Sequence, residues 1–168
     1  MNYLKVTTGI LLVLAASRFI PHPPNFTSLL ALSFYVPTIL GLSYLPVVMI
    51  SFVITDLFLG FHQVTLFTWG SVLIIGLTTK YFKNYFLSRL MGAQFGCLIF
   101  FILTNFGVWI LGGYEYSFSG LITCYTLAIP FYINSIIGCL VFSLIIECLI
   151  KIFSKQIKSS HLYKIETN

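Results

Sequence analysis

The sequence predicts an all-α integral membrane protein built from six transmembrane helices. Of its 168 residues, 58% are hydrophobic and only 8% are charged, and the mean hydropathy is +0.99. Soluble domains carry roughly a quarter charged residues, so this chain cannot cover a water-exposed surface and needs lipid as its solvent. The apolar runs are continuous rather than alternating, which favours helices over the strands of a membrane barrel.

The apolar runs define a single domain over residues 1–168. A spanning helix needs about 20 mostly apolar residues, which leaves room for six spans and no separate soluble domain. The predicted spans cover residues 3–20, 26–42, 44–60, 64–79, 90–111 and 126–150, followed by a basic tail at 151–168. Gly112 and Gly113 predict the end of the fifth span, and Pro130 predicts a kink in the sixth. Residues 114–125 are expected to form an interfacial re-entry.

Positive charges orient these spans. Lys80, Lys83 and Arg89 lie between the fourth and fifth spans, and further lysines lie in the tail. Cytoplasmic loops carry an excess of Lys and Arg, and the two spans between these clusters bring them to one side. Four spans separate Lys5 from the first cluster, so both termini are predicted to be cytoplasmic. The net charge of +5 then reflects membrane topology rather than binding of nucleic acid.

The first span also has features of a secretory signal peptide. Lys5 precedes a short apolar run that ends at Ala15-Ala16-Ser17, which resembles a cleavage site. The apolar run is short, however, and removing the span would spoil the agreement among the three positive regions. We therefore expect the span to be retained.

Residues 18–27, Arg-Phe-Ile-Pro-His-Pro-Pro-Asn-Phe-Thr, interrupt the apolar chain with polar groups and three prolines. Proline fixes its own φ and pushes the preceding residue out of the helical region. This segment, called the proline-rich turn below, is therefore predicted to be a rigid, extended connection between the first two spans. We expect it to form the rim of a binding site on the extracytoplasmic side.

With this topology, polar side chains gather in the outer half of the predicted bundle and the inner half is almost purely apolar. A channel should place polar groups along its whole path, whereas this pattern describes a cup open to the outside. The predicted substrate-binding residues are Arg18, His22, Asn25, Asp56, His62, Asn105, Trp109, Tyr125 and Asn134.

Asp56 needs a partner, because a carboxylate within hydrocarbon is costly and usually faces the bundle interior. Arg18 lies at a similar predicted depth, and the pair either binds the ligand or locks the first span to the third. His22 and His62 are expected to hydrogen-bond to a ligand or to backbone. A metal site that adds Asp56 and Cys124 lacks the spacing of known zinc motifs, so no metal is expected.

Asn105 and Trp109 are four residues apart and share one helical face. An unsatisfied amide is expensive in a membrane, so Asn105 favours a pocket. Trp109 fits either that pocket or the aromatic belt at the interface. Asn134 is expected either to bind the ligand or to satisfy the carbonyl that Pro130 leaves free.

Other patterns predict packing rather than chemistry. Glu147 and Lys151 are expected to form an i,i+4 pair at the cytoplasmic margin. Gly92 and Gly96 form a GxxxG motif, which predicts close helix contact. The four cysteines show no CxxC spacing and are interpreted as small hydrophobic residues. The sequence contains no HExxH, GxSxG or P-loop motif, so we expect no catalytic residue, no cofactor and no enzyme activity.

Several segments together resemble a family of uncharacterised bacterial putative transport proteins. The similar segments are residues 18–27, 56–62 (DLFLGFH), 104–109 (TNFGVW), Tyr125, 128–131 (AIPF) and 134–138 (NSIIG). That family is similar to the S components of energy-coupling factor (ECF) transporters. The resemblance implies a six-helix bundle in the bacterial inner membrane that captures a solute from outside. It also implies a membrane coupling subunit with ATPases as partner.

We therefore expect a substrate-binding membrane component for uptake of a small, vitamin-like solute. Aromatic side chains near the outer face offer surfaces for stacking a ring, and the polar residues could orient its edges. The alternative is a non-transport structural or assembly subunit whose outer loops bind a protein partner.

Overall fold

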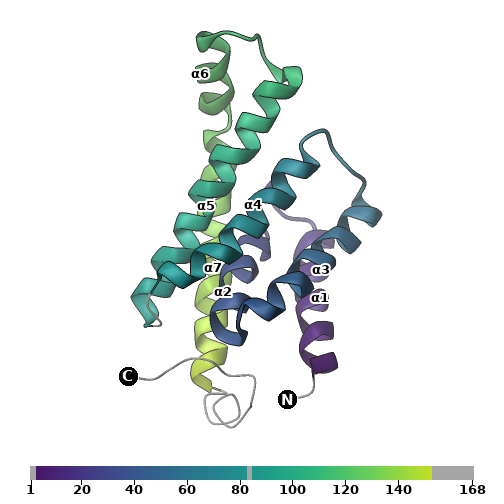
Figure 1. Ribbon diagram of the computed structural model, residues 1–168, viewed down its shortest axis with the longest axis vertical. Coiled ribbons are helices and arrows are strands. Elements are labelled where there is room, and N and C mark those ends of the chain that lie inside the picture. Colours follow the sequence, from purple (N-terminus) through teal and green to yellow (C-terminus); the bar gives the residue numbers. More distant parts are fainter. Residues whose placement is uncertain (1–2, 83–84, 153–168) are drawn as a thin grey trace.

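The computed structural model describes residues 3–82 and 85–152, and every regular element in these residues is helical. The predicted all-α class is therefore confirmed. The helices are α1 (Tyr3–Phe19), α2 (Leu29–Leu40), α3 (Leu45–Leu59), α4 (Thr65–Thr78), α5 (Phe86–Val108), α6 (Phe118–Leu127) and α7 (Ile129–Ile152). The short helical turns are η1 (Leu42–Tyr44), η2 (Thr79–Tyr81) and η3 (Trp109–Gly113). The start of α1 and the end of α7 lie at the same end of the molecule (Figure 1).

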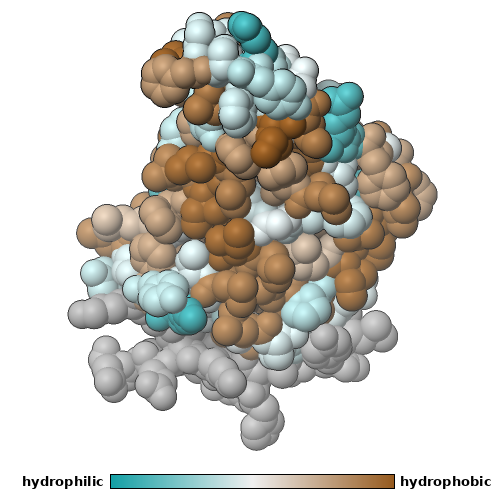
Figure 2. Space-filling view, turned by 45° about the horizontal axis from the view of Figure 1, so that its top comes forward, coloured by the Kyte–Doolittle hydropathy of each residue, from teal (hydrophilic) through white to brown (hydrophobic). Residues whose placement is uncertain are grey.

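Three stretches are long and apolar enough to cross a membrane: Leu42–Leu59, Phe86–Gly113 and Ile129–Ile152. With 12 and 14 residues, α2 and α4 rise only about 18 and 21 Å, against a hydrocarbon core of about 30 Å. The helix α1 has 17 residues. Hydrophobic residues cover the middle of the surface, and hydrophilic residues lie towards its ends (Figure 2). The surface and the three long stretches are consistent with a membrane protein.

The helix α2 lies at the centre of the molecule. Ten of its twelve residues are buried, because α3, α4, α5 and α7 pack around it. A helix that is hydrophobic on all sides suits such a buried position. The helix α1 packs mainly on α3, and α5 packs on α7, so two helix pairs flank α2 and α4.

Glycines allow α5 to approach α2 and α4 closely. A Cβ atom added at Gly92 would come within 2.2 Å of the Phe34 ring of α2, and one at Gly96 would come within 3.0 Å of Ile75 of α4. The close packing predicted from the GxxxG motif is confirmed.

The chain after α5 differs in part from the prediction. The π turn η3 ends at the predicted glycines, where Gly112 adopts a φ of 85°. Residues 114–125, predicted as an interfacial re-entry, instead contain most of the regular helix α6. Ala128 alone separates α6 from α7, and Pro130 lies in the first turn of α7, where its missing N–H breaks no helical bond. The interruption thus falls where Pro130 predicted a kink.

Arg89 is buried at the start of α5, although the sequence placed it in the basic connector before the fifth span. Its Nε and Nη2 atoms donate to Oε1 and Oε2 of Glu147 in α7, at 2.7 and 2.6 Å. The prediction that Glu147 pairs with Lys151 is therefore wrong. A guanidinium satisfies both oxygens of a buried carboxylate at once, whereas Lys151 is exposed. Lys83 and the predicted basic tail from residue 153 onwards lie outside the described residues.

Candidate functional site

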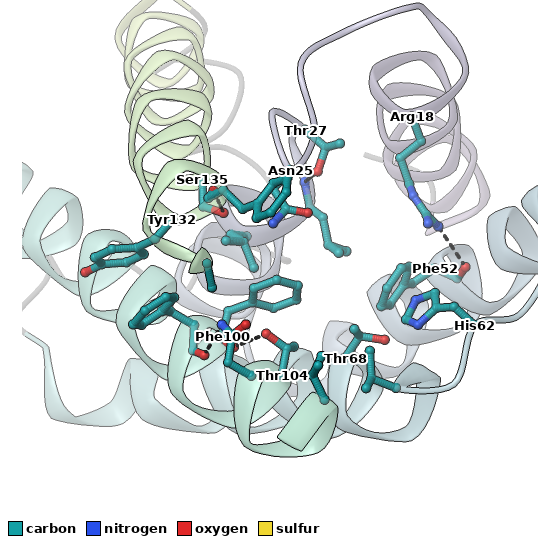
Figure 3. A pocket seen from close by; sticks show the side chains of 18 of the residues that line it. Arg18, Asn25, Thr27, Phe52, His62, Thr68, Phe100, Thr104, Tyr132 and Ser135 are labelled. Atoms are coloured by element: carbon teal, nitrogen blue, oxygen red, sulfur yellow. Dashed lines mark hydrogen bonds between the residues drawn. The ribbon is translucent and has the colours of Figure 1, made fainter. Parts of the chain in front are cut away.

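A cavity of about 360 Å³ lies where the proline-rich turn, the 60–64 loop and helices α1 to α5 and α7 converge. Five of the nine predicted site residues line it, and they come from separate parts of the chain: Arg18, His22, Asn25, His62 and Asn105. Aromatic rings complete the wall: Phe52, Phe100, Phe101, Phe131 and Tyr132. Figure 3 shows Arg18, Phe52 and His62 on one side and Tyr132 and Ser135 on the opposite side.

The proline-rich turn is held in shape by its own hydrogen bonds. The Phe26 amide donates to the Pro23 carbonyl at 3.0 Å, and Asn25 adopts a φ of 64°. Proline in the second position and a positive φ in the third are the pattern of a type II turn, in which asparagine is well tolerated. At the base of the turn, the Ser17 and Ser28 hydroxyls lie 2.7 Å apart. The rim predicted from the prolines is thus a well-defined turn.

The same turn is anchored on α7. Gly138 lies so close that an added Cβ atom would be 3.1 Å from the Cα atom of Phe26. The ring of Phe26 packs beside that of Phe142, with 6.2 Å between the centroids. This contact holds Asn25 and His22 over the cavity.

Arg18 and Asp56 form the predicted ion pair, with 2.6 Å between Nη2 and Oδ1. Arg18 also donates to the Thr55 hydroxyl, and its guanidinium lies 4.7 Å from the centroid of the Phe52 ring. Asp56 is 1% exposed, and its Oδ2 atom accepts from Nε1 of Trp69 at 2.7 Å. The carboxylate therefore joins α1, α3 and α4, and it lies behind Arg18 rather than in the cavity wall.

Three further predicted residues also lie outside the wall. Nε1 of Trp109 donates to the Glu115 carbonyl at 3.1 Å, so this indole closes the turn between α5 and α6. The Tyr125 hydroxyl donates to the Ile102 carbonyl at 2.7 Å and ties α6 to α5. Asn134 is half-buried on α7.

The profile of one protein family matches residues 2–160 of the chain. The chain belongs to DUF6580, a family of unknown function. No curated protein and no solved structure matches this DUF6580 protein. One family thus covers nearly the whole chain, and nothing in this match links it to the S components of ECF transporters.

Sequence reasoning missed the hydroxyl residues of the DUF6580 cavity. Thr68, Thr104 and Ser135 line it together with the predicted residues. Thr104 lies four residues after Phe100 and four before Val108, and all three line the cavity. That spacing marks one face of α5 and could have identified Thr104 from the sequence.

The described residues of this DUF6580 protein contain no group of three or more His, Cys, Asp or Glu side chains able to share a metal ion. His22 and His62 both line the cavity. The Nδ1 atom of His22 lies 2.7 Å from the carbonyl of Pro23, so one ring nitrogen is engaged by backbone. The site can therefore offer hydrogen bonds, one paired cation and several aromatic faces.

Proposed function

We propose that this DUF6580 protein is the substrate-binding component of an uptake system for a small, vitamin-like solute. The solute enters the cavity beneath the proline-rich turn from the extracytoplasmic side. The observation that carries the proposal is the convergence of Arg18, His22, Asn25, His62 and Asn105 on one cavity. Its volume of about 360 Å³ lies within the range of small-molecule sites, roughly 300–1,000 Å³.

The proposal includes six membrane crossings with both termini in the cytoplasm. It is supported by the position of the α1 start and the α7 end at one end of the molecule (Figure 1). Lys80 and Lys151 are exposed, as the cytoplasmic margin of a membrane protein requires. The helix α7 forms the sixth crossing, and it begins after the break at Ala128 beside the cavity.

We further propose an S-component-like role in the bacterial inner membrane. The sequence contains no nucleotide-binding motif, so energy for uptake would come from a membrane coupling subunit with ATPases. The small solute and the lipid bilayer are the other partners.

Thermal-shift screening tests the capture function. The protein in lipid nanodiscs is screened against vitamins and nucleobases, and a ligand should raise the Tm at micromolar concentration. Asn105→Ala should abolish this shift, because Asn105 lines the cavity. Asn134→Ala is the matched control, since it removes the same side chain from α7 outside the cavity, and it should leave the shift intact.

The competing function, a structural subunit bound to a protein partner, gives the opposite result. The purified protein would then retain a stoichiometric partner and show no shift with any small molecule. Co-purification under mild detergent, followed by crosslinking, separates the two functions.

A further inference from the structure

Three of the hydroxyl groups in the cavity wall have already used their protons. Thr68 donates to the Thr65 carbonyl at 2.8 Å, Thr104 to the Phe100 carbonyl at 2.7 Å and Ser135 to the Phe131 carbonyl at 3.0 Å. A hydroxyl has one proton and two acceptor lone pairs. Such bonds to the preceding turn are common for Ser and Thr in helices. Their consequence here is that three wall residues can only accept hydrogen bonds from a ligand.

His22 and Asn105 have each also used one N–H on a backbone carbonyl. The Nδ1 atom of His22 lies 2.7 Å from the carbonyl of Pro23, and a carbonyl can only accept, so Nδ1 carries the proton. The other ring nitrogen of the neutral imidazole is then an acceptor. The Asn105 amide donates one N–H to the Phe101 carbonyl at 2.7 Å, which leaves its carbonyl oxygen and one N–H.

The wall has little positive charge to offer an anion. Arg18 is the one Lys or Arg among the described residues that line the cavity, and Asp56 neutralises it at 2.6 Å. A carboxylate would therefore meet the lone pairs of Thr68, Thr104 and Ser135 and a guanidinium that is already paired. Arg18 lies across the cavity from Ser135 and Tyr132 (Figure 3).

The wall opposite Arg18 is aromatic. The rings of Phe101 and Tyr132 stack with centroids 4.5 Å apart, and both residues line the cavity with Phe100. Aromatic faces bind flat rings and attract cations through their quadrupole. A flat ring with N–H donors on its edge satisfies both the aromatic rings and the lone pairs of Thr104 and Ser135.

We propose that the cavity selects an amino-substituted nitrogen heterocycle, neutral or singly cationic, and rejects the carboxylate of the same ring. This inference rests on the proposed capture function and names its substrate class. The hydroxyl oxygens of Thr68, Thr104 and Ser135 accept hydrogen bonds from the amino groups, and the aromatic wall stacks on the ring.

Three pyrimidines of similar size test the proposal: 2,4-diaminopyrimidine, uracil and pyrimidine-4-carboxylate. Each is titrated at millimolar concentration onto the full chain in nanodiscs, and binding is measured by saturation-transfer NMR. Diaminopyrimidine should bind most tightly and the carboxylate most weakly. Thr104→Val keeps the shape of the side chain and removes its lone pairs. It should weaken diaminopyrimidine binding by about 3- to 10-fold, the loss expected for one hydrogen bond.

Thr38→Val is the matched control. Thr38 makes the same bond to the carbonyl four residues earlier, at 2.7 Å from Phe34, and it lies on α2 outside the cavity wall. This substitution should leave the affinity for all three pyrimidines unchanged.

The outcomes separate the substrate class from the capture function. Tighter binding of the carboxylate, or equal binding of all three pyrimidines, overturns the substrate class and leaves the capture function standing. A diaminopyrimidine affinity that Thr104→Val does not change overturns the assigned role of the hydroxyls. If no pyrimidine binds and the wider vitamin screen is also negative, both proposals fail.

Discussion

Asparagine in place of Asp56 isolates the charge of the buried ion pair. In the native protein Nε1 of Trp69 donates to Oδ2 of Asp56 at 2.7 Å. The amide oxygen of asparagine can still accept this hydrogen bond, so the substitution keeps both the bond and the shape of the side chain. Arg18 loses its counter-charge while its side chain is only 14% exposed. Two unit charges about 4 Å apart attract by about 4 kcal/mol at an effective dielectric constant near 20.

The expected loss of stability follows from this geometry. Removing one partner of a buried pair typically costs about 3–5 kcal/mol, because the other charge is left uncompensated. Arg18 borders the cavity, where water can reach it, and keeps its bond to Thr55. We therefore expect the low end, about 3 kcal/mol, which for a chain of this size lowers the Tm by about 6–12 °C.

Tryptophan fluorescence during heating in nanodiscs of fixed lipid composition measures the change. The double variant Arg18→Met/Asp56→Asn removes both charges and should regain at least half of the lost Tm. A fall of less than 2 °C for Asp56→Asn, or a double variant as unstable as the sum of its single variants, would refute the argument. The pair would then be too well hydrated to matter for stability.

Three further tests, each measured by thermal unfolding, probe other parts of the fold. Asn25→Gly should leave the Tm unchanged because glycine accepts the positive φ. Asn25→Ala should lower the free energy of unfolding by about 1–2 kcal/mol, and equal effects of the two substitutions would contradict the turn geometry. Gly92→Ala should lower the free energy of unfolding by about 1–3 kcal/mol through overpacking against Phe34. Gly70→Ala should leave it unchanged, because an added Cβ atom there meets nothing within 4 Å. Glu147→Gln should lower the free energy of unfolding by about 3–5 kcal/mol, because the buried Arg89 guanidinium loses its carboxylate partner. The ligand-induced rise in Tm should remain, and a selective loss of ligand binding would contradict the separation of this pair from the site.

Composition and charge were enough to predict the helical membrane class, because they depend on residue types and not on helix orientation. The proline-rich turn was also predictable, since the φ restriction of proline is a local property. The Arg18–Asp56 pair followed from depth and from the cost of an unpaired charge in lipid.

The remaining site residues depended on information that one sequence lacks. Depth alone placed Trp109 and Tyr125 near the cavity, but their polar atoms turn to the Glu115 and Ile102 carbonyls. The direction in which a side chain points depends on how its helix is rotated about its own axis. In a helix that is apolar on all sides, no apolar stripe in the sequence shows which face is turned towards the core. For the same reason Arg89 was assigned to the basic connector, since nothing local shows that Glu147 of α7 lies opposite.

The unequal helix lengths have a consequence for the surrounding lipid. From Phe86 to Gly113 the chain rises about 42 Å, whereas α4 rises about 21 Å, and both carry exposed apolar side chains. In the proposed topology, in which α4 also crosses the bilayer, acyl chains beside α4 would have to shorten and those beside α5 would have to extend, and each ångström of mismatch costs a fraction of a kcal/mol. Acyl-chain length would then be a physical control on the stability of the protein that operates without any solute.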